Sequence, residues 1–108
     1  MVRATTDEER LRRYKAALNK RIPIKEMILF GSRAKGTARP DSDYDLVIIS
    51  RDFKDVPFRE RPMPCMELWD INLFPTGADF LCYTPAEFKA KQRTLNVASI
   101  AAKEGVKI

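Results

Sequence analysis

"GSRAKGTARPDSDYDLVII", residues 31–49, joins a Gly-Ser pair to an apolar run through a loop that is rich in Arg, Lys and Asp. A second apolar run, EMILF, precedes the pair at residues 26–30. Short apolar runs bounded by turn residues are typical of buried strands. We therefore expect one strand over residues 26–31 and another over residues 43–50, so that the loop begins and ends at a strand boundary.

Two carboxylates alternate at the start of the second expected strand. Because successive strand side chains point to opposite faces, Asp43 and Asp45 project to one side, and Tyr44 and Leu46 project to the other. Two carboxylates that lie so close repel each other unless a cation sits between them. With only oxygen donors on offer, Mg²⁺ or Mn²⁺ is the cation that suits the pair, and phosphate oxygens and water complete its coordination.

The start of the loop supplies groups that suit a phosphate. Gly31 has no Cβ and lets the backbone approach an anion, while the Ser32 hydroxyl and nearby backbone N–H groups can donate to phosphate oxygens. Arg33, Lys35 and Arg39 add positive charge to the same loop. We assign nucleotide binding to Gly31, Ser32 and Arg33, although the loop matches neither the P-loop pattern nor G-x-G-x-x-G.

The composition limits the chemistry that the chain can perform. Of 108 residues, 44% are hydrophobic and 32% are charged, which is typical of a globular protein, and the length predicts one domain over residues 1–108. There is no histidine, which excludes Ser-His-Asp triads and histidine zinc sites. Cys65 and Cys82 lack metal-ligand spacing and are expected to be free and packed. Tyr44 and Trp69 could stack on a base, but core packing is favoured.

The chain shows neither a stretch of apolar residues long enough to span a membrane nor a secretory leader after Met1. We therefore expect a cytoplasmic protein without a membrane partner. The net charge of +5 favours polyanionic ligands such as a nucleotide. Direct nucleic-acid binding through a basic first helix is not expected, because no RRM or KH motif is present.

Helical periodicity and helix-capping residues predict the remaining helices and strands. Thr5 and Thr6, each followed three residues later by Glu, form capping-box patterns ahead of a helix. Thr84 and Glu87 form another. The expected elements are helices over 7–21, 64–74, 85–93 and 94–104, a loop over 53–64, a strand over 78–83 and a small edge strand over 106–108. Short strands between helices predict an α/β (α+β) fold, a small sheet with helices packed on it.

The Gly-Ser pair, the ten residues after it and the D-x-D triplet resemble the signature of the DNA polymerase β-like nucleotidyltransferase superfamily, specifically its minimal nucleotidyltransferases (MNT proteins). The resemblance extends to the later strand in "ADFLCYTPAEF". It implies a palm-like mixed sheet flanked by helices, with two divalent ions held between three carboxylates and a nucleoside triphosphate. Carried over, Gly31 and Ser32 hold phosphates, Asp43 and Asp45 ligate metal, and Asp79 is the third acid.

Three acids compete for the third position. Asp70 and Glu67 lie in a segment that is expected to be helical, where a lone acid is most simply a solvated side chain or a cap. Asp79 precedes the apolar residues 80–82 and can stand at a strand end beside the second strand, so we choose Asp79 as catalytic and metal-binding together with Asp43 and Asp45. Asp41 is assigned to a turn.

The resemblance implies an enzyme that moves a nucleoside monophosphate, AMP from ATP, onto a hydroxyl acceptor with Mg²⁺ as cofactor. Small MNT proteins are often paired with HEPN-domain proteins as antitoxin and toxin, so a HEPN protein is the expected partner and a hydroxyl on it an expected acceptor. The alternative is a binding module that neutralises such a partner by contact without catalysis. The intact carboxylate set favours activity over that alternative.

Overall fold

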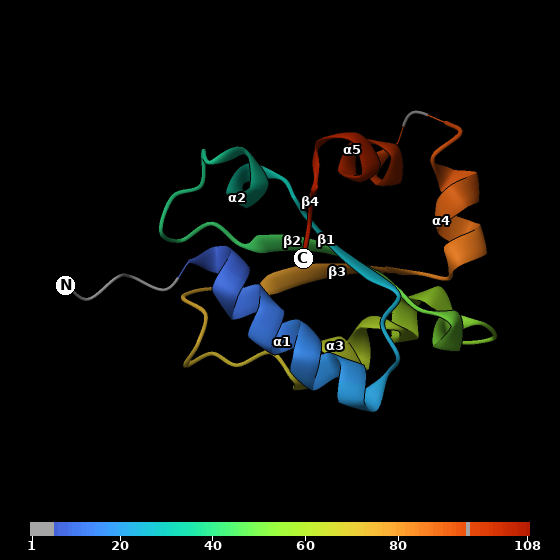
Figure 1. The fold of residues 1–108 in the computed structure, drawn as a ribbon, viewed down its shortest axis with the longest axis horizontal. Coiled ribbons are helices and arrows are strands. Elements are labelled where there is room, and N and C mark those ends of the chain that lie inside the picture. Colours follow the sequence, from blue (N-terminus) through green and yellow to red (C-terminus); the bar gives the residue numbers. More distant parts are fainter. Residues whose placement is uncertain (1–5, 95) are drawn as a thin grey trace.

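A computed structural model describes residues 6–94 and 96–108 of the chain (Figure 1). Its elements are α1 (Asp7–Arg21), β1 (Glu26–Phe30), α2 (Ser32–Lys35), β2 (Tyr44–Ile49), two 3₁₀ turns η1 (Arg51–Phe53) and η2 (Phe58–Glu60), α3 (Pro62–Glu67), β3 (Ala78–Tyr83), α4 (Pro85–Lys91), α5 (Val97–Glu104) and β4 (Val106–Lys107).

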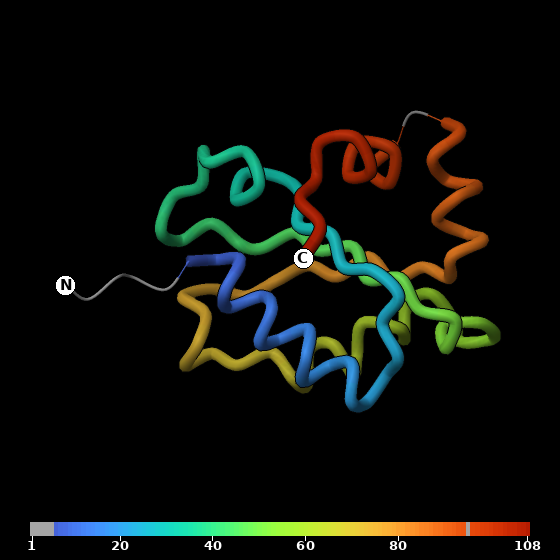
Figure 2. Tube along the Cα trace, in the orientation of Figure 1, coloured from blue at the N-terminus to red at the C-terminus, as the bar shows by residue number. Residues whose placement is uncertain are grey.

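The described strands form one four-stranded sheet in the order β3-β2-β1-β4. β1 runs antiparallel to both β2 and β4, whereas β2 and β3 run parallel. The parallel pair needs a long connection, and Figure 2 traces it in green and yellow on the side of the sheet where α1 lies. The predicted class, a small mixed sheet flanked by helices, is confirmed.

Two apolar clusters cover the two faces of the sheet. The larger cluster joins α1 and α3 to one face and includes Leu11, Tyr14 and Leu18, which are spaced along α1 as the helical period predicts. The smaller cluster joins α4 and α5 to the other face through Phe88, Ala98 and Ala101. β2 is therefore buried on both faces, and its successive side chains pack alternately into the two clusters.

The first helix begins and ends as the sequence predicts. Thr6 caps α1, and its hydroxyl accepts the N–H of Glu9 at 3.1 Å; Thr5 lies outside the described residues.

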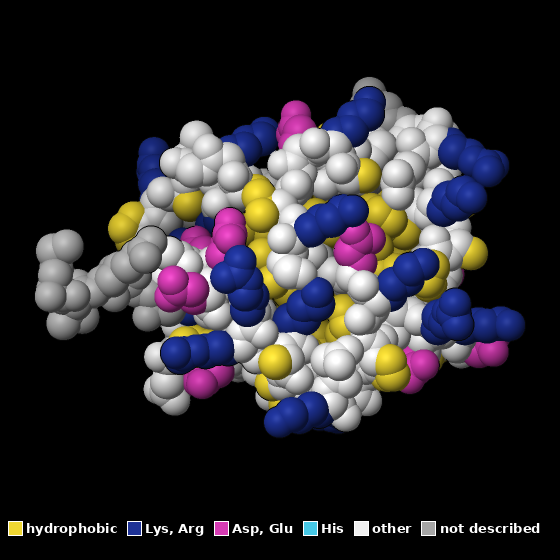
Figure 3. Space-filling model, in the orientation of Figure 1, with side chains coloured by type: hydrophobic (Ala, Val, Ile, Leu, Met, Phe, Trp, Pro, Cys, Tyr) yellow, Lys and Arg dark blue, Asp and Glu magenta, His cyan; other side chains and the backbone are white. Residues whose placement is uncertain are grey.

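Figure 3 shows Lys and Arg side chains spread over one face of the molecule with Asp and Glu among them. Exposed basic residues of α1 form ion pairs, Arg12 with Glu8 and Arg21 with Glu67.

The segment between β2 and β3 differs from the prediction. The expected loop over 53–64 contains η2 and the start of α3, and the expected helix over 64–74 is the shorter α3, which ends at Glu67. Beyond it the chain turns, because the Asp70 carboxylate accepts the N–H of Asn72 at 2.8 Å. The Trp69 ring stacks on Phe74 with centroids 3.8 Å apart. This turn and the aromatic packing therefore end the predicted helix early.

The carboxyl-terminal elements follow their capping signals. Thr84 and Glu87 form the predicted capping box of α4, which ends at Lys91, two residues earlier than expected. Asn96 caps α5 and delays its start to Val97, because its side chain accepts the N–H of Ser99 at 3.2 Å; residue 95 lies outside the described part. The predicted edge strand is confirmed as β4.

Several core predictions are also confirmed. Tyr44 is fully buried and packs edge to face against Trp69, with centroids 5.5 Å apart. Cys65 and Cys82 are free, buried thiols.

None of the described helices is long and apolar enough to cross a membrane.

An ion pair between the buried Arg61 and the partly exposed Glu87 ties the β2–β3 connection to α4. Arg61 is 6% exposed and donates to both carboxylate oxygens of Glu87 at 2.6 and 3.1 Å. The same guanidinium donates to the carbonyl oxygens of Val56 and Cys82. The hydrogen bonds from Arg61 are the main reason that the pKa of Glu87 falls from 4.5 to about 2.

We expect Glu87→Gln to lower the free energy of unfolding at pH 7 by about 1 to 3 kcal/mol, because Arg61 stays buried without its charged acceptor while glutamine can still cap α4. A carboxylate whose pKa is lower in the folded than in the unfolded state stabilises the fold at pH values above its unfolded pKa. That stabilisation is lost as the pH falls through the folded pKa. The difference between wild type and variant should therefore shrink from pH 4.5 towards pH 2. Urea unfolding across this range measures it, with the exposed Glu60→Gln as control; a difference independent of pH would contradict the assignment.

Candidate active site

Three chain segments meet at one end of the sheet. Since β1 and β2 are antiparallel, the last residue of β1, Phe30, pairs with Asp45 near the start of β2. Since β2 and β3 are parallel, Asp45 also pairs with Asp79 near the start of β3. The Gly-Ser pair follows β1 directly, so Gly31 and the two acids come together from segments that are far apart in sequence.

Alternation along β2 decides which face carries the acids. Tyr44 and Leu46 belong to the cluster under α1, whereas Val47 and Ile49 belong to the cluster under α4 and α5. Asp45 lies in phase with Val47 and Ile49, on the α4–α5 face. The prediction that Tyr44 and Leu46 turn away from the carboxylates is confirmed.

Asp79 shares that face. Its neighbours Phe80 and Cys82 pack in the cluster under α1, so Asp79 projects to the same side as Asp45. Asp43 lies one residue before β2, and both Asp43 and Asp79 are exposed. The three predicted acids therefore lie around the amino ends of the two parallel strands.

The acids interact through their charges. Burial first, and then the carboxylates of Asp79 and Asp43, raise the pKa of Asp45 above its ordinary value. Such mutual repulsion is the condition that a divalent cation relieves, and the oxygen-only donor set fits Mg²⁺ or Mn²⁺. Among residues 6–94 and 96–108, no three His, Cys, Asp or Glu side chains already converge as a closed metal cage. Mg²⁺ does not require one, because it keeps water and phosphate ligands beside one or two carboxylates.

Gly31 lets the Asp45 carboxylate lie against the backbone. It has φ 75° and ψ −157°, a conformation that is almost restricted to glycine. A Cβ at this position would collide with Oδ2 of Asp45. Gly31 is also the N-cap of α2, in whose first turn the N–H groups of Ser32 and Arg33 have no intrahelical acceptor. The backbone around the Gly-Ser pair can therefore donate to an anion beside the acids.

Arg33 is held away from the acids by several contacts. Its guanidinium is 9% exposed, pairs with Asp7 at 3.3 Å, and donates to the carbonyl oxygens of Ser42 and Pro40 at 2.9 and 3.2 Å. It also lies over the Tyr44 ring, 4.1 Å from the centroid. Since Tyr44 belongs to the cluster under α1, the guanidinium lies on the α1 side of the sheet. Nucleotide binding by Arg33 stays a prediction, and these contacts favour a positioning role.

Asp7, in the first turn of α1, links this arrangement to the helix. It accepts the Tyr44 hydroxyl at 2.6 Å and an Arg10 N–H at 3.2 Å. Burial first, and then the hydrogen bond to Asp7, raise the pKa of Tyr44 to about 12, so its hydroxyl remains a donor at neutral pH.

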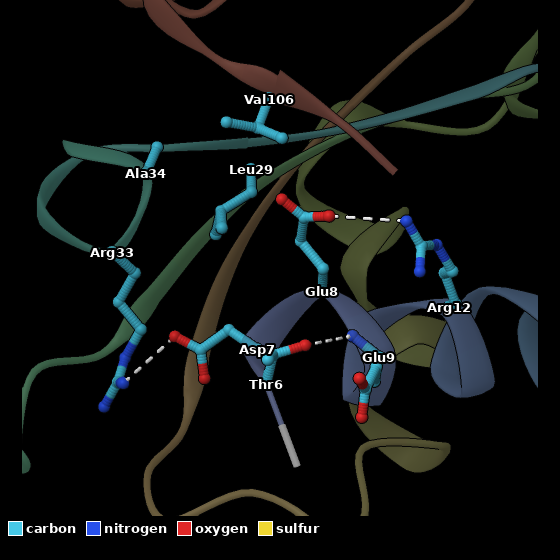
Figure 4. Close-up of a pocket in the computed structure, with 9 residues that line it drawn as sticks. All are labelled: Thr6, Asp7, Glu8, Glu9, Arg12, Leu29, Arg33, Ala34 and Val106. Carbon is cyan, nitrogen blue, oxygen red and sulfur yellow. Dashed lines mark hydrogen bonds and ion pairs between the residues drawn. The ribbon is translucent and has the colours of Figure 1, made fainter. Parts of the chain in front are cut away.

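Asp7 and Arg33 border a hollow of about 450 Å³ between α1, β1, β4 and α2 (Figure 4). In Figure 4, Asp7 and Arg33 point toward one another across it. Asp7, Glu8 and Glu9 give its α1 side a negative charge, which is unfavourable for a polyphosphate. The two arginines that also line the hollow, Arg12 and Arg33, are paired with Glu8 and Asp7, so this hollow is a poor place for a polyphosphate.

The competing acids lie elsewhere. Glu67 pairs with Arg21 at 2.7 Å, near the end of α1. Asp70 borders a hollow that Arg13 and Tyr14 of α1 also line. Asp41 is exposed in a turn, as predicted. Among these acids and Asp79, only Asp79 is paired in register with Asp45.

Sequence reasoning missed Asp7 and Thr76. Thr76 donates its hydroxyl to the Ser42 carbonyl at 2.8 Å, across 34 residues of chain. Asp7 is 26 residues from Arg33. Neither residue carries a local spacing signal, so only the folded arrangement reveals their contacts.

The model of a family described as a nucleotidyltransferase domain matches residues 11–107. The chain belongs to this family. Its fold is similar to the crystal structure, at 1.40 Å resolution, of a proposed nucleotidyltransferase from Sulfolobus solfataricus, with 21% identity, a TM-score of 0.57, and coverage of 99% of this chain and 89% of the other. Among curated proteins, none matches the chain significantly.

Family membership supports transfer of a nucleotide group and a nucleotide substrate. Nucleotidyltransferase domains typically use a divalent metal, and the carboxylates at the amino ends of β2 and β3 have the donor chemistry for it. The structural likeness confirms the predicted nucleotidyltransferase fold.

Two glycines with similar φ angles allow a matched test of the Gly31–Asp45 contact. Gly31 and Gly36 have φ values of 75° and 77°, but a Cβ at Gly36 would meet no atom within 4 Å. We expect Gly36→Ala to cost roughly 1 kcal/mol, the penalty of left-handed backbone. Gly31→Ala should cost about 1 to 3 kcal/mol more, because its ψ of −157° is nearly restricted to glycine and because Asp45 must also move. Urea unfolding of both variants measures the difference; equal losses would show that Gly31 is not needed for the position of Asp45.

Proposed function

We propose that this chain is a minimal nucleotidyltransferase that transfers AMP from ATP to a hydroxyl acceptor and releases pyrophosphate. The observation that carries the proposal is the pairing of Asp45 with both Phe30 and Asp79. It brings the Gly-Ser pair and the acids to one end of the sheet.

The order of the strands gives the proposed site two sides. Gly31 and Ser32 lie on the β1 side of Asp45, and Asp79 lies on the β3 side. Backbone N–H groups and the Ser32 hydroxyl would hold the triphosphate on the first side. The acceptor hydroxyl would then approach from the second side, next to Asp79.

In the proposed reaction, the acceptor oxygen forms a bond to the α-phosphorus while the bond from that phosphorus to the pyrophosphate oxygen breaks. Two Mg²⁺ ions, replaceable by Mn²⁺, would lower the pKa of the acceptor hydroxyl and neutralise the triphosphate and leaving group. Asp43 and Asp45 would hold both ions. Asp79 would hold the ion on the acceptor side and take the hydroxyl proton.

The chain has no histidine to act as a base, and the proposed reaction does not need one. Transfer of this kind depends mainly on positioning and charge stabilisation. The raised pKa of Asp45 reflects crowding with Asp79 and Asp43. Cations between such carboxylates would stabilise their charged forms, which supports a mechanism based on metal ions.

The third acid can be identified by comparing two aspartates. We expect Asp43→Asn, Asp45→Asn and Asp79→Asn each to reduce metal-dependent transfer at least about 100-fold, because charge is lost at nearly constant shape. Asp70→Asn is the matched control on the α1 side and should retain wild-type transfer. Incubation with labelled ATP, Mg²⁺ and total cell protein measures transfer and reveals what becomes labelled. Activity that survives Asp79→Asn and is lost in Asp70→Asn would show that Asp70 is the third acid.

The proposed acceptor is a HEPN-domain protein, with the chain acting as its antitoxin in the cytoplasm. This part of the proposal rests on the resemblance to MNT proteins. Attached AMP would add negative charge near the partner's active site and obstruct RNA binding there.

Mass spectrometry of a co-expressed HEPN-domain partner tests this role. We expect added AMP with the wild-type chain and none with the Asp43→Asn, Asp45→Asn double variant, since the variant cannot hold the metal. Neutralisation of the partner by both proteins without added mass would instead support a binding module that acts by contact.

A further inference from the structure

One backbone oxygen joins the segments that carry the proposed site. The carbonyl of Ser42 accepts the Nε–H of Arg33 at 2.9 Å and the hydroxyl of Thr76 at 2.8 Å. This carbonyl belongs to the peptide bond that leads into Asp43. Its two donors therefore fix the backbone directly at the first carboxylate of the D-x-D triplet.

The two donors come from opposite sides of β2. Arg33 follows the Gly-Ser pair on the β1 side, and Thr76 lies three residues before Asp79 on the β3 side. Beside the Thr76 contact, the Tyr44 N–H donates to the Gly77 carbonyl at 3.0 Å. The Ser42 oxygen is thus the point at which the phosphate-facing loop, the D-x-D triplet and the third acid are connected.

Each donor is itself held in place. Arg33 is fixed by Asp7, as Figure 4 shows, and by the carbonyl of Pro40. The backbone of Thr76 is fixed by the partly buried Trp69, whose indole N–H donates to the Thr76 carbonyl at 2.9 Å. Because both donors are anchored to the α1 side of the molecule, the Ser42 carbonyl has little freedom to move.

We infer that Arg33 and Thr76 are positioning residues that set the place of Asp43 relative to Asp45 and Asp79. The inference rests on the proposed function, and it gives Arg33 a role other than contact with the nucleotide. Residues 37–39, 42 and 43 have no regular secondary structure. A metal ligand on such a segment needs an outer contact to hold its geometry, and loss of such a contact weakens metal binding.

Metal binding without nucleotide tests the inference apart from catalysis. Free Mn²⁺ is measured by its electron paramagnetic resonance signal during titration with purified full-length protein. We expect Thr76→Val to weaken Mn²⁺ binding about 10-fold, because the hydroxyl donor is lost at constant shape. Thr76→Ser keeps the hydroxyl and should bind as wild type does. Thr37→Val makes the same change at an exposed position of the loop and should also have no effect.

Arg33→Lys separates positioning from nucleotide binding. Lysine keeps the charge but cannot contact Ser42, Pro40 and Asp7 with one planar group. We expect it to weaken Mn²⁺ binding as Thr76→Val does, whereas a residue that only contacts the nucleotide would leave Mn²⁺ binding unchanged. The melting temperature of each variant, measured without metal, verifies that the protein being titrated is folded.

The outcomes distinguish the two proposals. Wild-type Mn²⁺ affinity in both Thr76→Val and Arg33→Lys, with loss only in the Asp43→Asn, Asp45→Asn double variant, would overturn the positioning role and leave the proposed function intact. Weak binding by Thr76→Ser as well as Thr76→Val would also contradict the role of the hydroxyl. Equal binding by wild type and the double variant would also overturn the positioning role, and the transfer assay with labelled ATP would then decide the proposed function separately.

Discussion

The placement of β2 between an antiparallel and a parallel neighbour is the constraint on which the site depends. It brings the carboxyl end of β1 and the amino ends of β2 and β3 to one end of the sheet, with Asp45 paired to Phe30 on one side and Asp79 on the other. A slip of one residue would turn Asp45 into the cluster under α1 and Tyr44 out of it. The burial of Tyr44 and Leu46 therefore fixes the face on which the acids lie.

Holding the acids together costs the fold some stability. Gly31 adopts a conformation that other residues rarely take, and the raised pKa of Asp45 reflects burial next to two other carboxylates. Hydrophobic packing on both faces of β2 offsets this cost. A cation between the acids would remove part of the repulsion, so the charge repulsion that disfavours this arrangement would also favour binding of the proposed metal ions.

Local signals in the sequence predicted most of the fold. The period of α1, the apolar runs of β1, β2 and β3, and the capping box at Thr84 each act within a few residues, and the structure confirms them. The connection between β2 and β3 was predicted poorly, because Trp69 stacks on Phe74 and Arg61 pairs with Glu87, 26 residues away. At the site, the motif and the resemblance predicted Asp43, Asp45 and Asp79, and the strand register pairs Asp45 with Asp79. Contacts to the Ser42 carbonyl depend on tertiary structure, and no spacing in the sequence encodes them.

The position of β3 at a sheet edge bears on what the proposed acceptor can be. Asp45 is half-buried beside Gly31, whereas Asp79 is exposed on the outermost strand. A small acceptor would need a pocket to orient its hydroxyl, but a macromolecule can align a hydroxyl through contacts made elsewhere on its own surface. The exposure of Asp79, the proposed third acid, at the edge of the sheet therefore suits an acceptor that completes the site with its own surface. This geometry favours a protein hydroxyl over a free small molecule as the proposed acceptor.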